Sequence, residues 1–160
     1  MSRAKEADFW YGSVLSALFN NKNGSITPAI VEGNDRRIYN FITDNTEFKL
    51  FIKYRSDKQN TKKNEYSSWL FTLTDDNIEE LCQYLKEGCN LIVALVCGVK
   101  SLKESQIALL DKDQIQEIID LNKTSITISR KNREKSFRVS IGGGRENSIM
   151  VKTDRLKELF

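Results

Sequence analysis

Apolar and polar positions recur with clear helical and strand periods along most of this chain. Near the start, Trp10, Val14 and Leu18 form the apolar stripe of an amphipathic helix. Residues 91–97 are apolar without alternation, which is typical of a central strand covered on both faces. The full pattern predicts a helix at 3–20; strands at 26–31, 39–43, 47–55 and 69–73; a helix capped by Thr74 and ended by Gly88; strands at 91–97 and 106–110; a helix capped by Asp111; strands near 126–128, 137–141 and 149–151; and a helix from Asp154.

This order of elements predicts an α/β (α+β) fold with a mixed β-sheet and flanking helices. Residues 1–98 have the order α-β-β-β-(β)-α-β, and a C-terminal extension, residues 99–160, adds β-α-β-β. No repeat or linker separates the two parts, and 160 residues suit one domain. We therefore expect a single domain over residues 1–160. Whether the extension joins the core sheet or forms its own lobe is open at this point.

The strand predicted at 47–55 alternates strictly and carries charge on one of its two faces. One face is apolar, with Phe48, Leu50, Ile52 and Tyr54. The other face holds Glu47, Lys49, Phe51, Lys53 and Arg55. Such a face is either an ordinary solvated surface or one side of a functional site.

Composition narrows the chemistry that the chain can perform. It contains no histidine, which excludes Ser-His and Cys-His catalysis, histidine bases and histidine-ligated zinc. Its three cysteines form no C-x-x-C pair, so we expect buried, reduced thiols at Cys82 and Cys97. The first residues lack the apolar core of a signal peptide, and the longest apolar run, 91–97, is too short to cross a bilayer. We therefore expect a cytoplasmic protein with no membrane partner.

Two short stretches, Tyr39-Asn40-Phe41-Ile42 and Phe51-Ile52-Lys53, make the chain resemble the PD-(D/E)XK nuclease superfamily over about residues 5–98. The resemblance implies a restriction-endonuclease-like core, α-β-β-β-α-β. In that family carboxylates hold Mg²⁺ and a lysine steadies the attacking water. Lys53 matches the family's lysine, whereas Asn40 and Phe51 stand where the family has acids. With the family motif aligned in this way, in what we call the first register, the resemblance implies a degenerate, non-catalytic member that needs no cofactor.

A second register keeps the acids and implies an active enzyme instead. It uses Asp35 and the triplet Glu47-Phe48-Lys49, whose charged residues share a strand face with Lys53. The first helix could add Asp8 as a further metal ligand. This alternative is a Mg²⁺-dependent nuclease in which Asp35, Glu47 and Asp8 hold the metal and Lys49 acts beside it; in the first register Lys53 is the relic of the catalytic lysine.

Basic residues gather in two segments, although the net charge of the whole chain is only +3. The second segment, Arg130 to Arg138, links two predicted strands. Phosphate contact is the function that such clusters predict, and charged solvent-facing loops are the alternative. We predict nucleic-acid contact for the first cluster, which comprises Arg36, Arg37, Lys49, Lys53, Arg55, Lys58, Lys62 and Lys63.

Three hypotheses for function therefore stand together. The first is a non-catalytic nucleic-acid-associated or regulatory module; the resemblance adds a phage, mobile-element or defence setting. The second is the active nuclease. The third is a protein-interaction module or inhibitor, which predicts an exposed apolar patch that includes Phe51 and Tyr54. The sequence does not name the partner, distinguish DNA from RNA, or give the oligomeric state.

Overall fold

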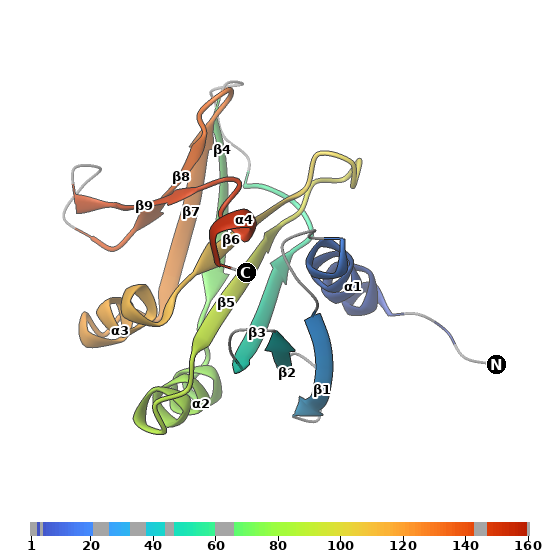
Figure 1. Cartoon of the computed structure of the whole chain (residues 1–160). Helices are drawn as coiled ribbons and strands as arrows, with labels where there is room; N and C mark the ends of the chain where they lie inside the picture. Colours follow the sequence, from blue (N-terminus) through green and yellow to red (C-terminus); the bar gives the residue numbers. More distant parts are fainter. Residues whose placement is uncertain are drawn as a thin grey trace.

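The computed structural model describes residues 3, 5–20, 26–32, 38–43, 47–59, 66–142 and 147–159. It confirms the predicted mixed α and β class, and the elements follow one another as the hydrophobic pattern predicts (Figure 1). They are α1 (Glu6–Phe19), β1 (Ile26–Glu32), β2 (Ile38–Thr43), β3 (Glu47–Arg55), β4 (Tyr66–Thr72), α2 (Asp75–Lys86), β5 (Leu91–Cys97), β6 (Gln106–Leu110), α3 (Lys112–Asp120), β7 (Ser125–Lys131), β8 (Ser136–Ser140), β9 (Ile149–Lys152) and α4 (Leu156–Leu159).

The strands form two sheets. The first sheet has the order β1-β2-β3-β5-β6 and is mixed, because β3 and β5 are parallel while its other neighbours are antiparallel. The second sheet has the order β4-β7-β8-β9 and is antiparallel throughout. A parallel pair needs a long crossover, and here the crossover from β3 to β5 contains β4 and α2.

The C-terminal extension does not form a separate lobe in the described part of the chain. Strand β6 extends the first sheet, and β7 to β9 pair with β4, which comes from the first part. One hydrophobic cluster contains Phe51 and Leu81 from the first part together with Ala108, Ile126 and Phe137 from the extension. The two parts distinguished in the sequence therefore share a core.

The first sheet has a different cover on each face (Figure 1). Helix α1 packs on one face, where Trp10, Val14 and Leu18 cluster with Phe48 and Leu50 of β3. The second sheet, α2 and α3 supply the cluster on the opposite face. Strand β5 lies between β3 and β6, and all seven of its residues are buried, so the prediction of a central strand is confirmed.

Local signals at the helix ends also act as predicted. The Thr74 hydroxyl accepts the backbone N–H of Asn77 at 3.1 Å and caps α2. Gly88 ends that helix with φ +72°, a left-handed conformation that suits glycine. The Asp111 carboxylate accepts the backbone N–H of Gln114 at 2.9 Å and caps α3. In the described residues no helix is long and apolar enough to span a membrane.

Candidate anion-binding cleft

The charged face of β3 is covered by protein, which corrects one of our sequence predictions. Phe51, at the middle of that face, has 0% of its surface exposed and packs in the cluster with Trp69 and Phe71. An exposed interaction patch that includes Phe51 is therefore wrong, because the second sheet covers the residue. Only the two ends of this face, Glu47 and Arg55, are exposed.

The two lysines of that face meet neutral amides. Lys49 Nζ donates to Asn40 Oδ1 at 3.0 Å, across the β2–β3 pair, and lies 4.7 Å from the centre of the Tyr84 ring. Lys53 Nζ donates to Asn77 Oδ1 at 2.7 Å. Both ammonium groups therefore have uncharged acceptors from neighbouring elements, and both side chains are only partly exposed.

Asn77 joins β3 to the start of α2. Its side-chain oxygen accepts both from Lys53 and from the backbone N–H of Thr74, at 3.1 Å, within the capping box. Only 1% of Asn77 is exposed, and its Nδ2 has no hydrogen-bond partner among the described residues. Lys53 thus completes a helix cap rather than facing an open cavity.

The metal ligands of the nuclease alternative are only partly within the described chain. Asp35 lies outside it, as do Arg36, Arg37, Lys62 and Lys63, so the predictions on these residues stay predictions. Asp8 accepts the backbone N–H of Lys5 at 2.8 Å and caps α1. Glu47 belongs to the face of β3 that points away from α1, so the structure does not bring Asp8 and Glu47 to one face. In the described ranges, no three His, Cys, Asp or Glu residues are grouped to hold a metal ion.

Tyr54 and Arg55 lie where β3 ends. The Tyr54 ring stacks on Trp10, with ring centres 6.1 Å apart, and meets the edge of Tyr11 at 5.9 Å. Tyr54 therefore packs with α1. The backbone oxygen of Arg55 accepts the N–H of Gly98 at 2.8 Å, which ties the end of β3 to the end of β5.

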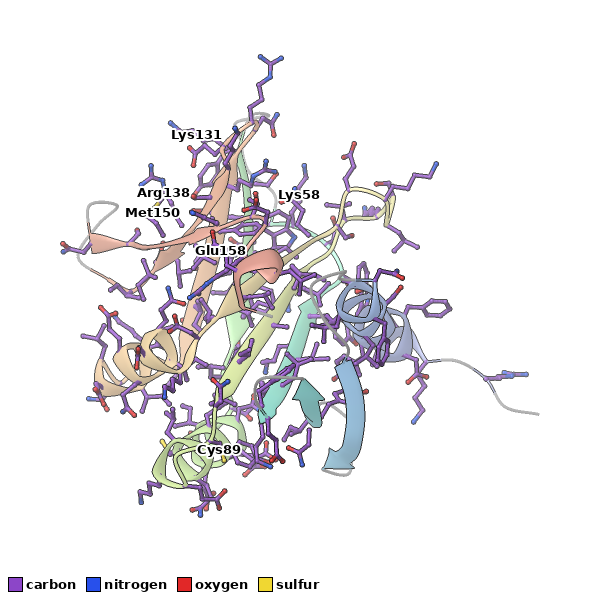
Figure 2. The ribbon with its side chains drawn as sticks, in the orientation of Figure 1. Lys58, Cys89, Lys131, Arg138, Met150 and Glu158 are labelled. Carbon is purple, nitrogen blue, oxygen red and sulfur yellow. The ribbon has the colours of Figure 1, made fainter. Side chains whose placement is uncertain are left out.

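A cleft of about 510 Å³ opens beyond these strand ends. Four basic residues line it: Lys58, Arg130, Lys131 and Arg133. Lys58 follows β3, whereas the other three come from the end of β7 and the turn into β8. Figure 2 labels Lys58 and Lys131 at the end of the molecule where the β7–β8 hairpin projects. The cleft therefore joins one residue of the first basic cluster to three residues of the second.

Strand pairing explains why these distant segments meet. Strand β7 pairs with β4 so that Lys131 lies opposite Tyr66 at the start of β4. The segment that carries Lys58 is held against β4 by two contacts between Gln59 and Ser68. The Gln59 N–H donates to the Ser68 backbone oxygen, and the Ser68 hydroxyl donates to Gln59 Oε1, both at 2.8 Å. The β4–β7 pair thus places the hairpin tip beside Lys58.

The cations of the cleft differ in how they are held. Arg130 is fixed, because its Nε donates to the Glu134 backbone oxygen at 2.6 Å and its Nη1 to Gln106 Oε1 at 3.1 Å. Within the ranges that the structure describes, no ion pair joins Lys58, Lys131 or Arg133 to a carboxylate. Three positive side chains therefore keep their charge available at the cleft.

Two further features of the cleft were not predicted from sequence. Glu104, Gln106 and Asn132 add acceptors and amides to the basic lining, and Trp69 and Val99 add apolar groups to it. Trp69 is held in place, since its Nε1 donates to the Gly98 backbone oxygen at 2.8 Å. The only sequence signal for this arrangement was the charged link between the strands predicted at 126–128 and 137–141. The sequence did not show which other strand pairs with these two.

Comparisons with known proteins add no relative. No protein-family model matches the chain, and searches of curated proteins and of solved structures found no match. Any function proposed for this chain therefore rests on its own geometry.

Proposed function

We propose that this protein is a non-catalytic nucleic-acid-binding module that contacts phosphates through the basic cleft. The observation that carries the proposal is the convergence of Lys58, Lys131 and Arg133 at one cleft, from segments more than 70 positions apart. Lysine and arginine side chains that no carboxylate of the described chain pairs with can neutralise the phosphates of a polyanion and release its counterions.

Two hydrogen bonds of the β3 lysines that the structure describes are offered for the non-catalytic part of the proposal. A lysine in a metal-dependent nuclease acts next to metal-binding carboxylates. Here Lys49 and Lys53 donate to Asn40 and Asn77, whose amide oxygens are neutral. The phage or defence setting, and the PD-(D/E)XK ancestry, remain predictions from the resemblance.

The test is a salt titration of binding. Labelled single- and double-stranded DNA and RNA are titrated with protein at several salt concentrations and read by anisotropy. The double variant Lys131→Ala, Arg133→Ala should weaken binding of a single strand and lower the salt slope by about 1.4, that is roughly 0.7 for each lost phosphate contact. Lys112→Ala is the matched control, because Lys112 is exposed on α3 and does not line the cleft.

Each alternative outcome points to a different function. If Lys112→Ala lowered the affinity and the salt slope as much per removed charge as the double variant Lys131→Ala, Arg133→Ala, only overall charge would matter, and the proposed site would be wrong. Cleavage of the probe in Mg²⁺ that disappears in Glu47→Ala would establish the nuclease instead. Absence of salt-sensitive binding to every probe would leave the protein-interaction hypothesis.

A further inference from the structure

The lining of the cleft contains more than a phosphate site requires. Glu104 faces the same cleft as four basic residues, and none of the ion pairs found in the described part of the chain involves it. A carboxylate repels phosphate, so it weakens a site that only neutralises phosphate charge. It accepts hydrogen bonds from N–H groups, however, and unpaired bases present such donors on their Watson–Crick edges.

The size of the cleft indicates which form of nucleic acid can use these groups. Its volume of about 510 Å³ falls within the range of roughly 300–1,000 Å³ that is typical of pockets for small molecules. A single nucleotide is a small molecule in this sense, whereas a duplex keeps the Watson–Crick edges of its bases paired and can meet only the rim. The amides of Gln106 and Asn132 beside Glu104 also suit an exposed base edge.

The backbone at the tip of the β7–β8 hairpin gives a second, independent observation. Arg133 has φ +71°, a left-handed conformation that is unfavourable for a residue with a Cβ. It lies in the turn closed by the Glu134 N–H, which donates to the Lys131 oxygen at 3.2 Å. Glycine would fit this position without strain. Backbone strain of this kind clusters at functional sites, and here the Arg133 side chain lines the cleft.

We propose that the cleft holds one unpaired nucleotide of a single strand, with its phosphate at Arg133 and Lys131 and its base edge at Glu104. This inference rests on the proposed function and names its ligand. It makes Glu104 a residue that selects an unpaired base, and it makes Arg133 a phosphate-binding residue retained at the expense of backbone strain.

The experiment compares variants on three probes: a single-stranded oligonucleotide, the blunt duplex of the same length, and inorganic pyrophosphate. The parent protein should bind the single strand at least tenfold more tightly than the duplex. In Glu104→Ala, affinity for the single strand should fall about tenfold, the loss of a charged hydrogen bond, while affinity for pyrophosphate should stay equal or rise. If Glu104 were only repulsive, Glu104→Ala would tighten binding of all three probes, and the inference would be overturned.

Arg133 is tested with two variants that separate charge from strain. Arg133→Gly should weaken single-strand binding roughly tenfold or more and raise the melting temperature by about 2–4 °C, since it relieves the left-handed strain. Arg133→Ala should weaken binding equally without the gain in melting temperature. Unchanged binding in both variants would refute the role of Arg133.

Trp69 supplies a readout that reports on the cleft itself. The chain has two tryptophans, and Trp10→Phe leaves Trp69 as the only one. A single strand that enters the cleft should change Trp69 emission, and free mononucleotide should compete with it. Salt-sensitive binding that Lys131→Ala, Arg133→Ala weakens, with no change in Trp69 emission, would overturn the nucleotide site in the cleft and leave the phosphate contacts of the proposed function intact. Failure of all nucleic acids to bind would instead contradict the proposed function.

Discussion

Gly98 gives the sharpest test of how the end of the first sheet is packed. It follows β5, and a Cβ built at this position would lie 2.5 Å from the Arg55 backbone oxygen and 2.7 Å from Trp10 Cη2. Ordinary contacts begin at about 3.5 Å, so alanine would force a backbone strand and a buried indole apart. Overpacking of this kind costs about 1–3 kcal/mol. Weakening the Gly98–Arg55 hydrogen bond would add about 0.5–1.5 kcal/mol.

We therefore expect Gly98→Ala to lower the free energy of unfolding by about 2–4 kcal/mol. In a chain of this size, the melting temperature should fall by about 5–15 °C. Gly12→Ala is the matched control, because Gly12 lies on the exposed side of α1 and a Cβ there would meet nothing within 4 Å. Since alanine is the better helix former, this control should gain about 1 kcal/mol.

The assay is urea denaturation followed by circular dichroism, so that it does not depend on either tryptophan. A double-mutant cycle with Trp10→Phe adds a test of the contact itself, because phenylalanine lacks the atoms that the new Cβ would strike. Gly98→Ala should destabilise the Trp10→Phe background less than the parent. If Gly98→Ala were as stable as the parent, or if the two substitutions were strictly additive, the packing described at Gly98 would be refuted.

Three further predictions rest on the described contacts. Thr74→Ala should lower the free energy of unfolding by about 0.5–2 kcal/mol through loss of the α2 cap, and Thr74→Ser should restore most of it in the same denaturation assay. Burial tends to raise the pKa of Asp111, but hydrogen bonds from Gln114 and Arg155 and the charge of Arg155 outweigh it and hold that pKa below the ordinary value of 3.8. Because the pKa of Asp111 is lower in the folded state, this carboxylate stabilises the fold above pH 3.8 and loses its contribution as the pH falls through the folded-state pKa. Arg155→Ala should flatten the acid denaturation curve between these two pKa values. An unchanged curve would refute the stabilising contact between Asp111 and Arg155. Burial strongly raises the pKa of Cys97, so a thiol reagent should label it only on unfolding, and labelling at the rate of the partly exposed Cys82 would contradict its burial.

Most elements could be predicted because their signals are local. The Thr74 and Asp111 caps, the left-handed Gly88 and the unbroken apolar run 91–97 each act through neighbours in sequence. The two sheets could not be predicted, because alternation in β4 shows that the strand has two faces but not which strand pairs with it. In the chain β4 lies between β3 and α2, and the structure pairs it with β7 of the extension.

The same limit explains why Phe51 on the charged face of β3 was predicted to be exposed. A strand with four charged residues on one face resembles a solvated surface strand, yet a lysine can bury its apolar stem and bring only its amine to a polar partner. Asn40 and Asn77 are those partners, and neither pairing has a signature in the sequence. Phe51 was the informative residue: a large aromatic side chain between two lysines is better explained by the second sheet above it than by an exposed patch.

The partners of the basic residues also decide where a ligand should bind. Lys53 already donates to the Asn77 cap, so Lys53→Met should lower the melting temperature and leave single-strand affinity nearly unchanged. Lys131→Ala should do the reverse, because Lys131 is exposed at the cleft and no carboxylate in the described chain pairs with it. Measuring melting temperature and affinity on the same two variants tests this separation directly. If Lys53→Met abolished binding while the protein stayed folded, the ligand site would lie on the β3 face, as the resemblance to nucleases first suggested, and not in the cleft.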